Sequence, residues 1–254
     1  MLRNIPEVLP QPCVATIGFF DGVHRGHRYL IEQVREVAVV HGLASGVVTF
    51  PVHPRKVVQP EYHPELLTAY EEKVALLAET GLDYCMMLDF TPEVAILSAK
   101  EFMLFLYNHY NIRALVIGYD HRFGHNRSEG FDDYVRYGQE LGIEVILAHA
   151  YIDKDVAVSS SVIRQLLSEG NVSEAASCLG YDYFLNGIVV SGYRVGRKIG
   201  FPTANLRVDD PDKLVPSDGV YAVRVTVAGQ SYGGMLSICL LYTSPSPRDV
   251  EESR

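Results

Sequence analysis

Two histidines in a glycine-containing loop are the residues of this chain best suited to do chemistry. His24 and His27 lie three positions apart, and Gly22 and Gly26 are interleaved with them. Glycine allows a close backbone approach to a ligand, and an imidazole can donate a hydrogen bond to a phosphate oxygen. The spacing therefore predicts an anion site, most naturally for a phosphate, in which both histidines reach one ligand. A simple scaffold turn with two surface histidines is the alternative interpretation.

The elements on either side of this loop must position the histidines. Residues 13–17 form an apolar run typical of a strand, and apolar residues recur with helical spacing between Tyr29 and Ala38. A helix that directly follows a strand turns its free N–H groups and the positive end of its dipole toward the loop. Asp21 is expected either to cap this turn or to contact the ligand. A metal site would need carboxylate or further histidine partners, and the nearby sequence offers no such cluster.

The segment GFFDGVHRGH at residues 18–27 resembles the signature of the HxGH nucleotidyltransferase superfamily, in the form found in the branch that makes flavin adenine dinucleotide (FAD). Members of that branch often have asparagine where this chain has Phe19. The resemblance implies that His24 and His27 are catalytic. It also implies that ATP is bound by Gly18, Phe19, Asp21, Gly22 and Gly26.

Length, composition and charge limit the possible classes of protein. The chain has 254 residues, enough for one large or two modest domains, and 48% hydrophobic and 21% charged residues are ordinary for a globular protein. Its formal net charge of −9 argues against a general nucleic-acid-binding protein. We find no apolar run of the ~18 residues that a membrane helix needs, no secretory signal, and no paired-cysteine motif. These features predict a cytoplasmic protein that acts on small molecules, without a nucleic-acid or membrane partner.

Strand and helix patterns alternate from residue 13 to about residue 150, and this alternation predicts the fold class. Apolar, β-branched runs occur at residues 13–17, 46–50, 84–88, 114–117 and 143–147. Thr68 to Glu71 and Ser98 to Glu101 both match the capping box that begins a helix. We predict an α/β domain with a Rossmann-like, doubly wound parallel sheet. Ligands of such sheets bind at the carboxyl ends of the strands, so the loops that follow strands should form the site.

Two of these loops have unusual polar content. Residues 51–56 include Arg55 and Lys56, which could be anion donors or part of a solvated basic turn. Residues 118–127 mix glycine, aromatic and hydrogen-bonding side chains, which favours a ligand loop over a simple connection. This second loop resembles the Gly-Tyr-Asp-x-Arg-Phe-Gly segment of the same family, which lies near the nucleotide and the flavin. The resemblance implies ligand contacts from Asp120, Arg122 and Phe123.

A third loop, after Val158, contains three serines followed by an arginine. Ser159, Ser160 and Ser161 can cap a helix whose first turn presents Arg164, and a plain helix cap with a solvated arginine is the alternative. The segment resembles the superfamily's second signature, Ser-Ser-Thr-x-Ile-Arg, which binds ATP phosphates. Ser161 replaces the usual threonine but keeps a hydroxyl group.

The reaction implied by the family is adenylyl transfer, in which ATP and flavin mononucleotide (FMN) give FAD and pyrophosphate. The FMN phosphate attacks the α-phosphate of ATP in line, so catalysis depends on positioning and on stabilising phosphoryl charge. His24 and His27 would donate hydrogen bonds to phosphate oxygens, Arg164 would neutralise the β- and γ-phosphates, and Mg²⁺ would assist the leaving group. The alternatives are a nucleotidyltransferase for another phosphorylated acceptor and a non-catalytic nucleotide-binding module.

The composition changes at Gly180, and strand patterns dominate after it. Alternating runs at residues 184–190, 220–227 and 230–238 predict the start of a small antiparallel β-barrel. The segment at residues 196–206 has a basic loop between two glycines that could hold phosphates, and oxygen ligands that could bind a hard cation. Taken alone, these residues favour an ordinary hairpin loop. It resembles the Gly-x-Pro-Thr-Ala-Asn motif of riboflavin kinases. The resemblance implies a MgATP site with Gly200, Pro202, Thr203 and Asn205, in which Thr203 and Asn205 are the metal ligands.

Bacterial proteins with these two domains in this order are bifunctional riboflavin kinases and FAD synthetases. We therefore predict an adenylyltransferase domain at residues 1–180, which has its own sheet and could fold alone, and the first part of a kinase domain at residues 181–238. Residues 239–254 end the strand pattern and resemble a translated sequencing adapter, with a natural divergent tail as the alternative. A barrel that lacks its later strands has unpaired edges, so we expect residues 181–254 to fold poorly and to lack kinase activity.

Overall fold

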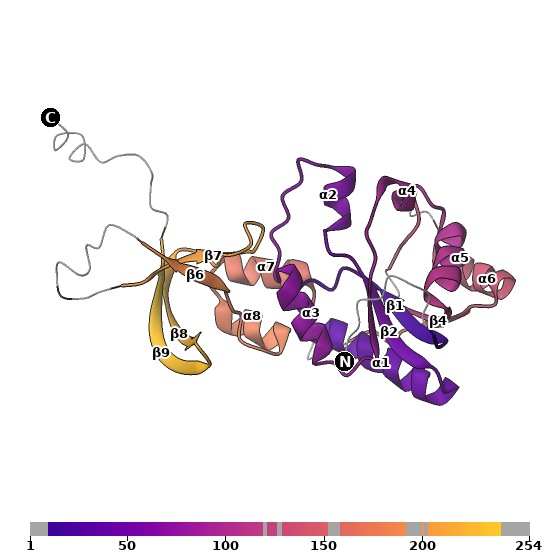
Figure 1. The fold of residues 1–254 in the computed structure, drawn as a ribbon, viewed down its shortest axis with the longest axis horizontal. Helices are drawn as coiled ribbons and strands as arrows, with labels where there is room; N and C mark the ends of the chain where they lie inside the picture. Colours follow the sequence, from indigo (N-terminus) through magenta and orange to yellow (C-terminus); the bar gives the residue numbers. More distant parts are fainter. Residues whose placement is uncertain are drawn as a thin grey trace.

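The computed structural model describes residues 10–118, 121–125, 129–151, 158–191, 200 and 203–239. A parallel sheet with its helices occupies one end of the elongated molecule, and the antiparallel strands of the second half occupy the other end (Figure 1). Helices α7 (Ser160–Ser168) and α8 (Val172–Leu179) lie between these two parts. Among the described residues, no helix is both long and apolar enough to cross a membrane.

Five strands form the parallel sheet. They are β1 (Cys13–Ile17), β2 (Ala44–Thr49), β3 (Tyr84–Met87), β4 (Ile112–Ile117) and β5 (Glu144–Leu147). Their spatial order is β3-β2-β1-β4-β5, and every neighbouring pair is parallel. This order confirms the predicted α/β fold. The chain runs outward from β1 in one direction and then returns to β4 on its other side, so the crevice expected for a ligand lies at the carboxyl ends of β1 and β4.

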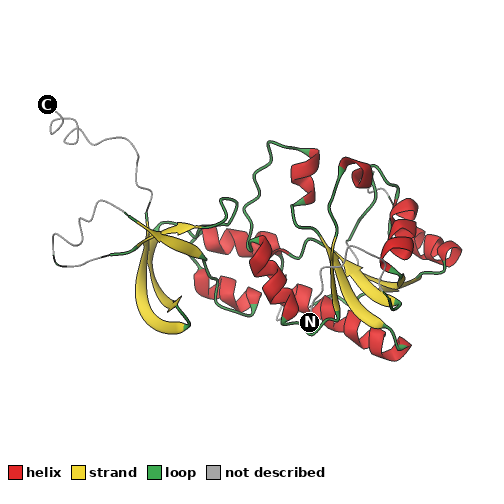
Figure 2. Ribbon diagram, in the orientation of Figure 1, coloured by secondary structure: helices red, strands yellow, loops and turns green. Residues whose placement is uncertain are grey.

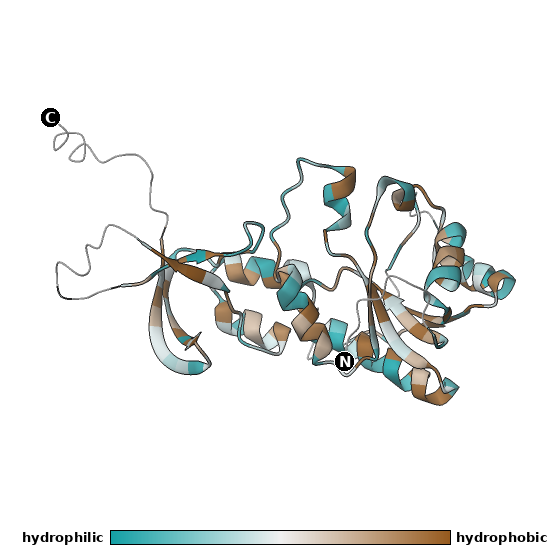
Figure 3. Ribbon diagram, viewed as in Figure 1, coloured by the Kyte–Doolittle hydropathy of each residue, from teal (hydrophilic) through white to brown (hydrophobic). Residues whose placement is uncertain are grey.

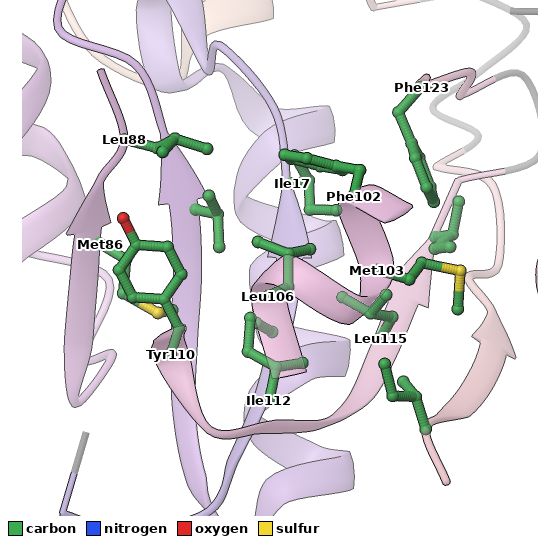
Figure 4. Close-up of a cluster of buried hydrophobic side chains, with 14 of the residues drawn as sticks. Ile17, Met86, Leu88, Phe102, Met103, Leu106, Tyr110, Ile112, Leu115 and Phe123 are labelled. Atoms are coloured by element: carbon green, nitrogen blue, oxygen red, sulfur yellow. The ribbon is translucent and has the colours of Figure 1, made fainter. Parts of the chain in front are cut away.

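Helices cover both faces of the sheet, because alternate residues of each strand point to opposite faces. The covering helices are α1 (Arg25–His41), α3 (Tyr70–Ala78), α5 (Ala99–Tyr110) and α6 (Phe131–Leu141), with α2 (Pro54–Val58) and α4 (Pro92–Ala95) as short additions (Figure 2). Cys13, Ala15 and Ile17 of β1 lie in one buried cluster with residues of α5 and α6, part of which is drawn in Figure 4. Val14 lies in a second cluster, with residues of α1 and α3.

The two predicted capping boxes have different outcomes. The box predicted at Ser98–Glu101 is confirmed, because before α5 the Ser98 hydroxyl accepts the Glu101 N–H at 3.3 Å and the Glu101 carboxylate accepts the Ser98 N–H at 2.8 Å. The box predicted at Thr68–Glu71 is wrong by one position, because the N-cap of α3 is Ala69, whose N–H donates to Glu72 at 2.9 Å. The Thr68 hydroxyl instead accepts a hydrogen bond from the backbone N–H of Gly22, so a partner distant in sequence takes the group that a local motif would use.

The strands of the second half form two antiparallel pairs. The pairs are β6 (Gly187–Val190) with β7 (Asn205–Val208), and β8 (Gly219–Val227) with β9 (Gln230–Ile238). In the part of the chain that the structure describes, they remain two separate two-stranded sheets. The ribbon of these strands includes hydrophobic stretches (Figure 3). Several of their apolar residues are exposed, with Val189, Val220 and Met235 at 72%, 70% and 84%. The described strands therefore do not close a barrel.

Candidate active site

The two histidines lie side by side at the start of α1. His24 is the N-cap residue, and its Nδ1 accepts the backbone N–H of His27 at 3.3 Å. The two imidazole rings stack with centroids 3.6 Å apart and planes 17° apart. Because Nδ1 of His24 is an acceptor, the neutral ring has its proton on Nε2, which is then the donor available to a ligand.

Burial keeps both imidazoles uncharged near pH 7. It lowers the pKa of His24 from 6.5 to about 4, an effect that Asp21 opposes and Arg164 reinforces. Burial also lowers the pKa of His27 well below its ordinary value, and repulsion from a protonated His24 and from Lys73 lowers it further. The Nδ1 atom of His27 is buried and has no hydrogen-bond partner among the described residues. An unpaired buried polar atom beside a helix N-terminus fits a site that a ligand completes.

The depressed pKa of His24 should make the protein less stable in mild acid. As the pH falls below 6.5 the unfolded chain binds a proton at this position while the folded chain does not, so stability is lost until about pH 4 and this group has no further effect below that. The loss attributable to His24 is about 3 kcal/mol. Urea unfolding of the parent and of His24→Asn at pH 7 and pH 4 measures it, because asparagine can cap the helix but does not titrate there. An equal pH dependence in both proteins would contradict the assignment.

Asp21 joins the histidine loop to two other segments. It lies in the 3₁₀ turn Asp21–Val23, where its buried carboxylate accepts N–H groups from Leu67 at 2.9 Å and from Thr68 at 3.1 Å. It also accepts a hydrogen bond from Nη2 of Arg164 at 2.5 Å. These contacts with protein groups hold the turn, which is one of the two roles expected for Asp21.

The serine–arginine segment packs directly on this loop. The Ser159 hydroxyl accepts the Val162 N–H at 3.3 Å and caps α7, and the Ser160 hydroxyl donates to the Asp21 carbonyl oxygen at 3.0 Å. Ser161 is exposed. Nε of Arg164 donates to the Glu65 carbonyl oxygen at 2.6 Å. The N-termini of α1 and α7, far apart in sequence, are therefore brought to one place.

Two glycines of the first signature allow this close packing. Gly22 has a φ of +79°, and a Cβ atom there would lie 2.9 Å from Leu67 Cδ1. At Gly26 a Cβ atom would lie 3.3 Å from the His24 ring and 3.5 Å from the Val158 carbonyl oxygen. A larger residue at position 22 would displace Leu67, and one at position 26 would press on the His24 ring.

A pocket of about 940 Å³ opens beside the histidine loop at the carboxyl ends of the strands. Its lining comes from Ile17–Phe19 and from the loops after β2, β3 and β4. Its aromatic lining residues are Phe19, Phe50, Phe90, Phe102 and Phe123. Arg55 and Arg122 also line the pocket. The sequence left Arg55 open between an anion donor and a solvated turn, whereas it predicted a ligand contact from Arg122. Asp120 lies outside the described residues.

Lys73 is a site neighbour that the sequence analysis missed. It is buried on α3, its Nζ donates to the Phe50 carbonyl oxygen at 2.7 Å and lies 3.8 Å from the centroid of the Phe19 ring, and burial lowers its pKa to about 8. Phe19 also packs edge-on against His53, with centroids 4.7 Å apart. Lys73 lies three positions before Leu76 and four before Leu77, and both leucines are buried. The sequence could have indicated a buried lysine, because this spacing places Lys73 on the apolar face of the helix.

The residues assigned to a kinase site lie far from this one. Thr203 and Asn205 are exposed at the start of β7, beyond α7 and α8 from the parallel sheet (Figure 1). Gly200 has a φ of +87°, and Pro202 lies outside the described residues. The described residues of the two predicted sites therefore lie in different parts of the molecule.

A parallel α/β sheet that brings two helix N-termini together at its switch point is typical of enzymes that bind nucleotide phosphates. A family model for FAD synthetase matches residues 7–162, and one for riboflavin kinase matches residues 179–251. The chain belongs to the family of bifunctional riboflavin kinase/FMN adenylyltransferases.

Several relatives define this family membership. The bifunctional riboflavin kinase/FMN adenylyltransferase of Escherichia coli K12 is 36% identical over 230 residues, which cover 90% of this chain and 73% of the relative. The enzyme of the same name from Bacillus subtilis is 34% identical, with 89% and 71% covered. A crystal structure from Streptococcus pneumoniae, described as a macrolide-efflux protein, superposes with a TM-score of 0.81 at 33% identity and covers 91% of this chain and 75% of that one.

Proposed function

We propose that this chain transfers AMP from ATP to FMN at the paired histidines. The single observation that best supports this is the buried, unpaired Nδ1 of His27, stacked against His24 at a helix N-terminus. Two neutral imidazoles and the positive end of the α1 dipole face the place where phosphoryl charge would increase. Such preorganised donors stabilise a transition state without any covalent protein intermediate.

The second helix N-terminus is proposed to hold the remaining ATP phosphates. Arg164 uses two of its N–H groups on Asp21 and on the Glu65 carbonyl oxygen, and a guanidinium has five donors. Its position is therefore set by the protein while further donors can face the β- and γ-phosphates. At the start of α7, Ser159 and Ser161 would offer hydroxyl groups to the same ligand, while the Ser160 hydroxyl is bound to the Asp21 carbonyl oxygen and Ser160 would contribute its backbone N–H.

The aromatic pocket is proposed to bind the flavin ring of FMN. Its volume of about 940 Å³ is at the upper end of the usual range for ligand pockets, and its aromatic walls suit a large planar ring. Phe19 lies between this pocket and the histidine loop, where its ring contacts His53 and Lys73. Because Ile17, Gly18 and Phe19 line the pocket just before the histidine loop, an acceptor bound there would have its phosphate directed toward the histidines.

Mg²⁺ is proposed to arrive bound to ATP. Among the described residues, no group of three or more His, Cys, Asp or Glu side chains could hold a metal ion, so at the histidine site the phosphates themselves would be its main ligands. Thr203 and Asn205 are exposed oxygen donors of the kind that a hard cation prefers, and they would hold the ion in the kinase half. Bound Mg²⁺ supplies positive charge that stabilises the departing phosphate.

The kinase half of this chain is proposed to be inactive. Its described strands form two separate pairs with exposed apolar side chains, and a barrel in this condition has no enclosed core to hold riboflavin. The stretch at residues 239–254 is the one that resembles a translated sequencing adapter. Residue 239 is described, and residues 240–254 lie outside the described residues.

The riboflavin kinase family model matches the chain as far as residue 251 and so includes most of this stretch.

One assay tests both proposals on the full chain. With MgATP and FMN we expect FAD and pyrophosphate, whereas MgATP and riboflavin should give neither FMN nor FAD. Nicotinamide mononucleotide and phosphopantetheine serve as control acceptors. Product from either control, with none from FMN, would establish another acceptor, and turnover of riboflavin would overturn the inactive kinase half.

A further inference from the structure

A short segment of the second half packs against the adenylyltransferase part. We call residues 210–214, between β7 and β8, the strap. The Leu66 N–H donates to the Asp212 carbonyl oxygen at 2.7 Å, and the Leu214 N–H donates to the Leu66 carbonyl oxygen at 2.8 Å. Leu66 and Lys213 thereby form a parallel bridge, and Leu214 is buried with residues of α7 and α8.

Lys213 is the buried charge at the centre of the strap. Its Nζ donates to the Leu67 carbonyl oxygen at 2.7 Å and to the Glu72 carboxylate at 2.6 Å, and its side chain is 2% exposed. Glu72 also accepts a hydrogen bond from Asn186 at 2.9 Å. Burying an ammonium is unfavourable unless it is paired and hydrogen-bonded, and here both conditions hold.

The same peptide segment contacts Asp21 on its other side. We call residues 66–68 the wall. The wall N–H groups of Leu67 and Thr68 donate to the Asp21 carboxylate, and the Thr68 hydroxyl accepts the Gly22 N–H at 3.0 Å. Asp21 in turn holds Arg164. A continuous series of hydrogen bonds therefore leads from Lys213 through the wall to the arginine.

We propose that Lys213 is a positioning residue for adenylyl transfer, delivered by the kinase half of the chain. It fixes the wall from behind, and the wall sets the position of Asp21 and hence of Arg164. This inference rests on the proposed function of the histidine site and extends it to a residue outside the FAD synthetase match, which ends at residue 162.

Lys213→Met in the full chain tests the proposal. Methionine keeps the apolar stem but removes the donor to the Leu67 carbonyl oxygen, so the wall and the Arg164 guanidinium should shift. We expect the KM for MgATP in FAD formation to rise about tenfold, while the KM for FMN, which binds in the separate aromatic pocket, changes less than about twofold. A loss of folded protein alone would lower the apparent kcat and leave both KM values unchanged.

Asp212→Asn is the matched control on the same strap. It removes the ion pair between Asp212, whose side chain is 17% exposed, and Lys56, whose side chain is 33% exposed. The backbone hydrogen bonds between the strap and the wall remain in place. We expect both KM values to stay within about twofold of the parent. If Asp212→Asn raises the KM for MgATP as much as Lys213→Met does, the proposal is wrong, because the effect then belongs to strap attachment in general.

A double variant covers the case in which Lys213→Met folds poorly. In Glu72→Gln/Lys213→Met the buried carboxylate is neutral, so stability should recover, but the Leu67 carbonyl oxygen still has no lysine donor. A raised KM for MgATP in this folded protein supports positioning, and parental KM values overturn it. Failure of the proposed function is a different result, since the parent itself would then make no FAD.

Discussion

Replacing His27 with alanine should lower the kcat for FAD formation by about two to three orders of magnitude, because it removes a donor aimed at the charge that develops on the phosphate. His27 is suited to this role by its unpaired buried Nδ1 and by a pKa that burial lowers well below the ordinary value. The KM values for ATP and FMN should change much less, since the lost interaction is made mainly in the transition state.

His41→Ala provides the control for this prediction. His41 lies at the other end of α1, where it faces Glu144 at 3.6 Å, so the substitution tests the loss of a histidine from the same helix. Its rate of FAD formation should match that of the parent. Circular dichroism must show equal folding of both variants. If folded His27→Ala keeps more than about a tenth of the parental kcat, His27 is not a principal catalytic donor.

Replacing Asp21 with asparagine should have the largest effect on stability, with a loss of about 3 kcal/mol in the free energy of unfolding. The carboxylate is buried and is the common acceptor for the Leu67 and Thr68 N–H groups and for Arg164. Asparagine keeps the shape but turns a neutral amide toward a positive guanidinium that remains partly buried. FAD formation should fall together with stability, because the wall and Arg164 lose their shared anchor.

Urea denaturation at pH 7 measures this loss, with Glu140→Gln as the matched control. Glu140 pairs with Lys100 on the surface, where both side chains are close to half exposed, and its loss should cost no more than about 0.5 kcal/mol. Equal stability of Asp21→Asn and Glu140→Gln would show that the Asp21 contacts add nothing to folding. Retained FAD formation in Asp21→Asn would show that Arg164 does not depend on this anchor.

Local sequence was sufficient to predict the elements of the first half. The central strands β1 and β2 are buried on both faces, so β1 reads as a continuous apolar run, and the Ser98–Glu101 box lies within a single turn of backbone. The prediction at Thr68 was wrong because the hydroxyl binds Gly22, 46 positions earlier in the chain. Patterns that depend on neighbours in the chain were predictable, and those that depend on distant partners were not.

The sequence by itself determined the parallel α/β fold and singled out the histidine pair and the serine–arginine segment as the candidate site, because these depend on residue type and short spacing. Only the tertiary structure decided that both imidazoles are neutral, that Asp21 is held by Leu67, Thr68 and Arg164, and that Lys213 of the second half reaches the wall. Burial sets the first of these and long-range packing the others, and neither is encoded in any short stretch of chain.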